Sequence, residues 1–576
     1  MDHTTYPRPQ FVRETWQSLD GTWSYAFAGG SDLDGISWQG EIQVPYPPES
    51  PLSGVHDPSF HDQIWYRRTF SVPETWRGQR VLLHFGAVDY SASVWVNGQL
   101  VTTHEGGHTP FSADITLALR DGEQEVIVCA ADAPLEMDKP RGKQDWRPEP
   151  HGIWYPRTTG IWQPVWLEPV SDAHIAKLRL TPELSEFAFR TEVELAGNTQ
   201  GLSLEIAFKL NGTLLTSDRY HLTNSGIERL IHLPKPAFDD VLAYVWSPER
   251  PHLIDVELRL TADETVIDEV LSYTAMRAVE AKDGRFWLNT RPYFLRLALD
   301  QGYWDESLLA APSGEALKKD VELAKAMGFN GVRKHQKIED PRYLYWADKL
   351  GLLVWEEMPS AYEFSREAVG RLTREWLEVI ERDYNHPCIV TWVCFNESWG
   401  TPDLQHSEQQ RHYIEALYHL TKSLDASRPV VGNDGWEHVV TDLLTIHDYS
   451  HEAATLERRY GTPEDSLETS YQVLEHGRAI TLDSFDPGDQ PPILSEFGGI
   501  RYNPEQEGWG YQEAESPEAL LATYRELVAA VSGAGLAGFC YTQFADTFQE
   551  QNGLLYSDRR PKVALEALAQ ATRGGG

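Results

Sequence analysis

Short runs in which apolar and polar residues alternate fill roughly the first half of the chain, a pattern typical of antiparallel β-strands. The clearest runs lie at 82–85, 93–96, 125–129 and 203–208. Asn97-Gly98 and Asn211-Gly212 follow two such runs and predict tight hairpin turns. We therefore expect a jelly-roll domain over residues 1–170 and an immunoglobulin-like β-sandwich over residues 171–278.

After residue 278 the pattern changes to short apolar runs that alternate with stretches of helical periodicity. The predicted strands are Tyr293–Leu299, Gly331–Lys334, Leu352–Trp355, Ile389–Phe395, Val430–Val431, Leu443–Ile446, Ile493–Leu494 and Leu536–Tyr541. Helices are predicted at 313–327, 365–384 and 516–532, with a closing helix from Lys562. Eight strands with intervening helices predict a (β/α)8 TIM barrel over residues 279–576. The polar stretch 450–490 is predicted to be an active-site loop.

Length and charge narrow the classes of function. A chain of 576 residues is too long for one core, which agrees with several domains. The net charge of −37 argues against nucleic-acid binding, because such proteins usually present a basic face. It also disfavours a strongly polyanionic substrate, although a local basic pocket could override it.

Cysteine usage and hydropathy bear on metals, membranes and location. The four cysteines show no CxxC spacing, so neither a zinc site nor a disulfide framework is predicted. The first residues lack a basic-then-apolar signal segment, and no apolar run is long enough to span a membrane. We expect a cytoplasmic protein with no membrane partner. A homo-oligomer is compatible with the sequence.

Two of the apolar barrel runs each lead directly to a glutamate, Glu397 and Glu496. Burial of a carboxylate at the end of a strand costs free energy, so such a group is expected to be paired with a cation or to take part in catalysis. Two such groups favour glycoside cleavage, in which one carboxylic acid protonates the leaving oxygen and the other carboxylate attacks or activates water. The alternative, two salt-bridged structural residues, is less favoured because both glutamates lie in distinctive surroundings.

Active sites of TIM barrels lie at the carboxyl ends of the strands, and polar residues follow several predicted strands. The candidate substrate-binding residues found there are Asp300, Trp304, Arg333, His335, Asn396, His447, Tyr449, Tyr541 and Gln543. By this count Glu397 and Glu496 end strands four and seven, which face each other across the barrel. Asp145-Trp146 and Trp154-Tyr155 could reach the barrel mouth from the first domain, with an ordinary sandwich loop as the equal alternative.

The chain resembles glycoside hydrolase family 2, which includes β-galactosidases, β-glucuronidases and β-mannosidases. The first domain carries IWYRRTFSVP, HFGAVDYSASVWVNGQLVTTHEGGHTPF and GIWQPVWLEPV, which look like the family's sugar-binding jelly roll. The barrel carries NGVRKHQ, FNES and SEFG. An Asn-Glu pair ending strand four marks the acid/base of a large clan of retaining barrels, and SEFG supplies the matching nucleophile.

This resemblance implies roles for three residues. Glu397 resembles the acid/base, Glu496 the nucleophile, and Asn396 the residue that hydrogen-bonds the sugar's 2-hydroxyl. Retention requires carboxyl groups about 5–5.5 Å apart, so that a covalent glycosyl-enzyme can form. Ionised Glu496 is expected to raise the pKa of Glu397 and keep it protonated for the first step.

The chain departs from the family pattern at three places. Strand two has Arg333-Lys334-His335-Gln336 in place of Arg-x-Ser-His. No histidine follows the strand-three glutamates in Trp355–Pro359, so we expect no catalytic metal and no cofactor. Residues 551–555 lack the lysine with which β-glucuronidases bind a substrate carboxylate. A glucuronide is therefore a less favoured substrate.

The leading hypothesis is a retaining exo-glycosidase that removes one terminal sugar, with a β-galactoside as the first substrate. A β-glucuronide, β-mannoside, β-glucoside or arabinofuranoside remains open. A hypothesis of another class is a non-catalytic carbohydrate-binding protein built on an inactive barrel. A panel of chromogenic glycosides, with Glu496→Ala as control, distinguishes the two classes.

Overall fold

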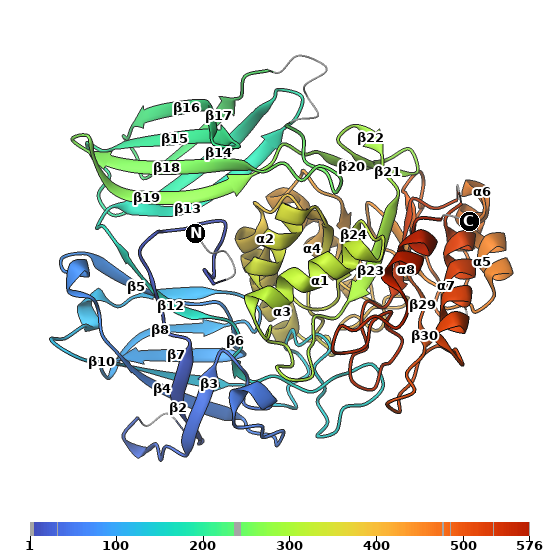
Figure 1. Ribbon diagram of the computed structural model, residues 1–576, viewed down its shortest axis with the longest axis horizontal. Coiled ribbons are helices and arrows are strands. Elements are labelled where there is room, and N and C mark those ends of the chain that lie inside the picture. Colours follow the sequence, from blue (N-terminus) through green and yellow to red (C-terminus); the bar gives the residue numbers. More distant parts are fainter. Residues whose placement is uncertain are drawn as a thin grey trace.

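Two β-rich domains lie side by side against a larger barrel domain (Figure 1). The computed structural model describes residues 5–30, 33–235, 244–474, 477–483, 485–533 and 535–574. Within these ranges no helix is both long and apolar enough to cross a membrane. The predicted fold class, a jelly-roll domain, a β-sandwich and a TIM barrel, is confirmed.

The first domain packs a six-stranded antiparallel sheet against a four-stranded one. The larger sheet runs in the order β3 (Gly40–Val44), β2 (Gly21–Phe27), β4 (Gln63–Phe70), β10 (Gln124–Ala131), β7 (Ser91–Val96) and β8 (Gln99–Glu105). The smaller runs β1 (Gln17–Ser18), β12 (Val165–Val170), β5 (Arg80–Phe85) and β9 (Phe111–Asp114), and β6 (Val88–Asp89) pairs with β11 (Gly160–Ile161). Asn97 and Gly98 turn β7 into β8 with positive φ angles, as their sequence predicts.

A buried carboxyl in this domain gives a test of stability against pH. Glu49 is buried and accepts a hydrogen bond from the Thr159 amide at 3.2 Å. Burial raises its pKa from 4.5 to about 7, even though Arg157 acts in the opposite direction. Because the folded state binds this proton more tightly than the unfolded chain does, the stability contributed by protonated Glu49 is lost as pH rises from 4.5 through about 7.

We expect Glu49→Gln to be more stable than the parent protein at pH 8, by on the order of 2–3 kcal/mol. The amide keeps an acceptor for Thr159 and cannot ionise, so the gain should be much smaller at pH 5. Urea denaturation at the two pH values measures the difference, with exposed Glu41→Gln on β3 as control. Equal differences at both pH values would show that the folded protein tolerates ionised Glu49.

The second domain is a sandwich of three and four antiparallel strands. One sheet contains β13 (His174–Glu183), β14 (Ala188–Ala196) and β17 (Gly226–His232). The other contains β16 (Thr213–His221), β15 (Ser203–Leu210), β18 (Ile254–Ala262) and β19 (Thr265–Thr274). Phe189 and Phe208 stack across the core, with ring centroids 5.3 Å apart.

A small sheet of β20 (Val279–Lys282), β21 (Arg285–Leu288) and β22 (Arg291–Pro292) leads into the barrel. The barrel strands are β23 (Leu295–Asp300), β24 (Gly331–Lys334), β25 (Leu353–Glu357), β26 (Ile389–Val393), β27 (Val430–Val431), β28 (Leu444–His447), β29 (Pro492–Gly498) and β32 (Gly538–Thr542). All eight predicted strands are present and pair in parallel in barrel order. Among the described residues β27, which has two residues, does not pair with β28.

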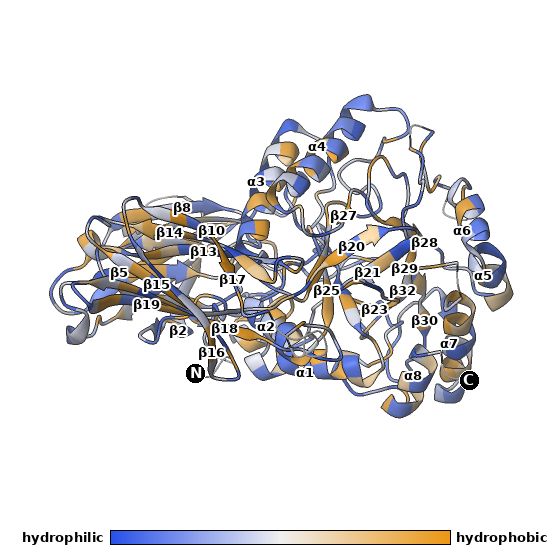
Figure 2. Ribbon diagram, turned by 90° about the horizontal axis from the view of Figure 1, so that it is seen from above, coloured by the Kyte–Doolittle hydropathy of each residue, from blue (hydrophilic) through white to orange (hydrophobic). Residues whose placement is uncertain are grey.

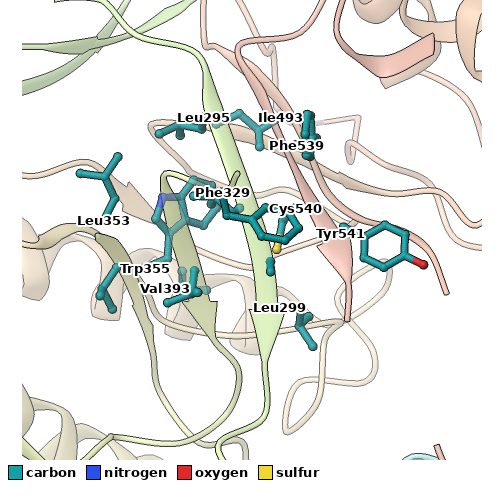
Figure 3. Packing of buried hydrophobic residues seen from close by; sticks show 14 of the residues in the cluster. Leu295, Leu299, Phe329, Leu353, Trp355, Val393, Ile493, Phe539, Cys540 and Tyr541 are labelled. Atoms are coloured by element: carbon teal, nitrogen blue, oxygen red, sulfur yellow. The ribbon is translucent and has the colours of Figure 1, made fainter. Parts of the chain in front are cut away.

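Helices surround the barrel strands, which are mostly hydrophobic, while the helices carry many hydrophilic residues (Figure 2). They are α1 (Gly314–Ala326), α2 (Pro341–Leu350), α3 (Arg366–Asp383), α4 (Glu408–Leu424), α5 (Ala453–Tyr460), α6 (Pro463–Ser470), α7 (Pro517–Val531) and α8 (Leu565–Thr572). Ser313, Ser365 and Ser516 cap α1, α3 and α7 by accepting hydrogen bonds from backbone amides. Side chains such as Leu295, Leu353 and Ile493 fill the centre of the domain (Figure 3).

The prediction of an active-site loop over 450–490 is wrong for much of that stretch, because α5 and α6 lie within it. Leu456 and Tyr460 are buried and lie four residues apart, so they form one apolar face. Thr462 and Asp465 form a capping box at the start of α6. The high polar content of the other helical positions conceals this short apolar face in the sequence.

The short strands β30 (Ile500–Arg501) and β31 (Gln512–Glu513) follow strand seven in the sequence and pair with each other in a separate two-stranded sheet. They hold the segment between them near the end of β29. Tyr511 comes directly before β31, and its backbone amide donates to the carbonyl of Gly499 at 2.9 Å. This pairing brings Tyr511 to the carboxyl end of strand seven.

Candidate active site

Glu397 follows strand four in an uncommon backbone conformation. Its φ is 53° and that of Ser398 is 58°, both in the left-handed region that non-glycine residues rarely adopt. The Glu397 amide donates to the carbonyl of Asp434 at 2.9 Å, and the Ser398 amide donates to Asn433 Oδ1 at 3.0 Å. The end of strand five therefore holds Glu397 in place. Such backbone strain concentrates at functional sites, where surrounding structure maintains it.

Glu496 lies within strand seven, and both of its carboxylate oxygens have fixed partners. Arg333 Nη1 donates to Oε1 at 2.8 Å. The Tyr449 hydroxyl donates to Oε2 at 2.5 Å and lies 3.2 Å from Thr542 Oγ1. These contacts fix the orientation of the Glu496 carboxylate at the carboxyl end of the barrel.

Glu397 and Glu496 lie close together, with His447 beside both. One carboxylate oxygen of each glutamate and a ring nitrogen of His447 all lie within 4.8 Å of one another. His447 Nδ1 is 2.8 Å from Glu397 Oε1, and Nε2 is 3.5 Å from Glu496 Oε1. The two carboxylates therefore approach each other at the carboxyl end of the barrel, as cooperating groups of a glycosidase must.

The charges around His447 change the expected protonation of Glu397. Burial alone would lower the pKa of His447, but the charge of Glu496 and the hydrogen bonds to Asp434 and Glu397 raise it to about 10. Burial alone would raise the pKa of Glu397, but the hydrogen bond and charge of His447 lower it to about 2. The sequence-based expectation of a raised pKa for Glu397 is therefore wrong, because it considered Glu496 without the histidine between them.

Arg333 is fully buried and contacts residues at the ends of four other barrel strands. Besides Glu496, it donates to Glu357 Oε2 and to Asn396 Oδ1, each at 2.6 Å, and it lies 2.7 Å from Asp434 Oδ2. Asn396 Nδ2 is buried, and no described group accepts a hydrogen bond from it. Arg333 thus orients the Asn396 amide so that its amino group is left for a ligand.

His335 lies in the same cluster, as the sequence predicts. Its Nδ1 is 2.9 Å from Glu357 Oε1, and the ring is buried. Burial, together with the charges of Lys143 and Arg333, lowers the pKa of His335 well below its ordinary value. His335 is therefore a neutral ring at neutral pH.

Four predicted site residues make their described contacts with groups other than the two glutamates. Asp300 pairs with Lys334 at 2.9 Å and accepts from the Gly302 amide, and Trp304 is buried between the cations of Lys337 and Arg559. Within the described chain no contact joins Asp300 or Trp304 to either glutamate.

The other two, Tyr541 and Gln543, lie in and directly after the last barrel strand. The ring of Tyr541 packs edge-on to Tyr524 of α7, outside the barrel, and points away from its centre (Figure 3). Side chains alternate along a strand, so Cys540 and Thr542 occupy the inner face. Gln543 is buried and donates to Asn552 Oδ1 at 2.7 Å, so it supports a loop, while its Oε1 has no hydrogen-bond partner among the described residues.

A loop of the first domain, residues 132–155, reaches the barrel mouth. The amides of Arg141 and Gly142 both donate to the carbonyl of Ser360, at 3.0 and 3.1 Å. The Tyr155 hydroxyl donates to Glu550 Oε2 at 2.7 Å. The expectation that Trp154-Tyr155 leans from the first domain toward the barrel agrees with these contacts.

Aromatic side chains connect this loop to Glu397. The ring of Trp154 lies 5.4 Å from that of Trp399 and 5.8 Å from that of Tyr362. Trp399 Nε1 donates to Glu397 Oε2 at 3.3 Å. The acid/base candidate therefore has an aromatic neighbourhood built from two domains.

Sequence reasoning missed several residues at the site. Tyr511 stacks on Tyr449 with ring centroids 3.5 Å apart, and Thr542 lies beside the Tyr449 hydroxyl. Lys143 and Glu550 approach the site from loops far from the glutamates in sequence. The inner-face alternation along β32 could have found Thr542, whereas no local pattern points to Tyr511 or Lys143.

Two clusters among the described residues have the spacing of a metal site, namely Glu397–His447–Glu496 and Asp348–His386–Cys388. At the first, Arg333 lies 2.8 Å from Glu496, and its fixed positive charge opposes a second cation. The ring nitrogens of His447 also face Glu397 and Asp434 as hydrogen-bond partners. These contacts favour a site that works without a metal.

We expect activity on an aryl glycoside to stay within about twofold after exhaustive treatment with EDTA, because Arg333 and His447 supply the positive charge at this site. Initial rates before and after dialysis against the chelator measure the effect. A loss of turnover that one divalent ion restores would show that a metal is required.

Two protein-family models match the chain. The model described as "Glycosyl hydrolases family 2, TIM barrel domain" matches residues 279–574, and "Glycosyl hydrolases family 2, sugar binding domain" matches residues 37–138. The first of these covers more than half of the chain.

Similar proteins include glycosidases of several organisms. A β-galactosidase of Thermoanaerobacter pseudethanolicus is 30% identical over 73% of this chain and 55% of its own length. A putative β-glucuronidase of Formosa agariphila is 27% identical over 90% of this chain and 62% of its own length. The chain thus spans less than two thirds of both. The solved Bifidobacterium dentium β-glucuronidase, at 20% identity, matches the fold with a TM-score of 0.78 over 99% of this chain and 98% of its own.

Proposed function

Because this chain belongs to glycoside hydrolase family 2, we propose that it removes one terminal sugar from a glycoside by double displacement with retained configuration. The observation that carries this proposal is the pair of carboxylates, whose nearest oxygens lie within 4.8 Å of each other. Covalent attack by one carboxylate needs such a short separation.

In the first step, an oxygen of Glu496 attacks the anomeric carbon while the bond from that carbon to the leaving oxygen breaks. Arg333 and Tyr449 hold the Glu496 carboxylate for this attack. Glu397 gives a proton to the leaving oxygen, so the departing group leaves as a neutral alcohol. The Asn396 amino group, which has no acceptor among the described residues, donates to the sugar's 2-hydroxyl in the transition state.

His447 explains how Glu397 can act as an acid although its own pKa is low. The negative charge of Glu496 is a major cause of the raised pKa of His447. That charge disappears as Glu496 forms the ester, so His447 then holds its proton less tightly. The proton can pass along the 2.8 Å contact from Nδ1 to Glu397. In the second step Glu397 accepts a proton from water, which attacks the ester and releases the sugar.

The first-domain loop supports an exo mode of action, because it packs over the ends of strands two and three at one side of the glutamates. Similarity to a β-galactosidase and to β-glucuronidases keeps both glycones under consideration, with the β-galactoside first. β-Mannosides, β-glucosides and arabinofuranosides complete the set of sugars to be tested.

A panel of 4-nitrophenyl glycosides tests the proposal, and proton NMR of the first-formed sugar gives its anomeric configuration. We expect turnover of at least one β-glycoside, with the β-anomer released first. Release of the α-anomer first would reject the retaining mechanism. Binding of sugars without turnover of any substrate would favour a non-catalytic carbohydrate-binding protein.

A further inference from the structure

Lys143 is a buried cation for which the described part of the chain supplies no counter-ion. Its side chain belongs to the first-domain loop and the residue is 6% exposed. No hydrogen bond, ion pair or aromatic ring within the described residues engages its ammonium group. Other buried lysines nearby are paired, for example Lys139 with Asp132 at 3.1 Å and Lys337 with Glu339 at 2.9 Å. An ammonium group that the surrounding chain leaves without a partner, in a residue this little exposed, is available to an anionic ligand.

The backbone around Lys143 is fixed against the barrel. The Tyr362 hydroxyl donates to the carbonyl of Gly142 at 2.5 Å, and the Tyr155 amide donates to the carbonyl of Lys143 at 2.8 Å. Gly142 has a φ of 59°, and a side chain there would place its Cβ only 2.2 Å from the Gln336 carbonyl oxygen. The loop therefore keeps Lys143 next to the residue that follows His335.

The charge of Lys143 acts on three residues that come from different sides of the barrel. It adds to the effect of His447 in lowering the pKa of Glu397 after strand four, adds to burial in lowering that of His335 after strand two, and opposes the burial that raises that of Glu550 after strand eight. The contacts of Gly142 with Tyr362 and Gln336 place Lys143 beside the ends of strands two and three, at the mouth that holds Glu397 and Glu496.

The carboxylate of Glu550 does not satisfy this lysine. Both of its oxygens are already engaged, Oε2 by the Tyr155 hydroxyl at 2.7 Å and Oε1 by Asn552 Nδ2 at 3.2 Å. Burial also raises the pKa of Glu550, which weakens it as a counter-ion. A ligand that brings its own negative charge would complete the site.

We propose that Lys143 binds the carboxylate of an acidic glycone, so that the preferred substrates are β-linked uronides, ahead of the β-galactoside. This inference rests on the proposed glycosidase function and names its substrate class. A C6 carboxylate can form a charge-assisted hydrogen bond with the ammonium group, whereas the C6 hydroxymethyl of a neutral sugar offers only a neutral oxygen. The strongly acidic surface does not prevent this, because recognition depends on the local charge.

Matched substrate pairs test the proposal, since each pair differs only at C6. We would measure kcat/KM for 4-nitrophenyl β-glucuronide against β-glucoside, and for 4-nitrophenyl β-galacturonide against β-galactoside. In the parent protein the acidic member of at least one pair should be preferred. Lys143→Met should lower that preference by about 100-fold, because it leaves the carboxylate without its buried partner. Lys143→Arg should retain much of it.

Lys139→Met is the matched control, because it removes a cation from the same loop that is already paired with Asp132. It should leave the preference unchanged, even where it lowers the amount of folded enzyme, since a ratio of rates does not depend on that amount. Turnover of neutral glycosides with none of the uronides would overturn the inference while the proposed function stands. An equal loss on both members of a pair in Lys143→Met would also overturn it. No turnover of any glycoside would instead reject the proposed function.

Discussion

Replacement of Glu496 by alanine should lower turnover of every substrate by at least about 10⁴-fold, as the loss of a nucleophile does in other enzymes. The variant loses the atom that forms the covalent intermediate, and the partners Arg333 and Tyr449 lose their acceptor. The loss should not depend on the leaving group, because without the nucleophile no glycosyl-enzyme can form. Initial rates with an activated aryl glycoside and with a natural glycoside measure the effect.

Small anions provide the control for this variant. Azide can occupy the space that the Glu496 carboxylate leaves and attack the anomeric carbon from the same side. The product is then a glycosyl azide of inverted configuration, which NMR identifies. Retained configuration with azide would assign the nucleophile to another residue, and a turnover close to that of the parent protein would place the active site elsewhere.

Replacement of Glu397 by alanine should have an effect that depends on the aglycone. A natural sugar aglycone needs protonation as it leaves, so its hydrolysis should fall by about 10³-fold, within the range of general acid catalysis. A 2,4-dinitrophenyl group leaves without a proton, so formation of the glycosyl-enzyme should be affected much less. A pre-steady-state burst of dinitrophenol, followed by slow turnover, would show that the second step has become limiting.

Azide should accelerate this second step in Glu397→Ala, because it attacks the ester without needing a base. The glycosyl azide should have retained configuration, opposite to the product of the Glu496 variant. The two stereochemical outcomes together assign the roles of the glutamates, and a reversed pattern would exchange them. Glu397→Gln keeps the contact with Trp399 and provides an isosteric check on folding.

Much of this architecture could be predicted from local sequence patterns, because strands and helices depend on short-range periodicity. The eight barrel strands begin and end within a few residues of their predicted limits, and the residues that end strands two, four, six and seven do meet. Tyr541 shows the limit of reasoning from strand ends. A shift of one residue along a strand moves a side chain from the barrel interior to its outside.

Protonation and contacts between domains could not be predicted in this way. The lowered pKa of Glu397 depends on a histidine of strand six, and the sequence gives no distance between them. Lys143 lies in a different domain from both glutamates, so no spacing rule connects them. The absence of a lysine in residues 551–555 argues against a uronide only if the cation must come from that segment.

The loop that fixes Lys143 against the barrel has a consequence for how such chains can evolve. A recombination event that exchanged the barrel alone would combine it with a loop from another protein. The close approach of Gly142 to the Gln336 carbonyl would then have to be restored as well. Specificity and catalysis would then be inherited on separate segments of the gene. Substitutions within residues 132–155 could therefore change which sugar is preferred as the substrate, while Glu397 and Glu496 stay the same.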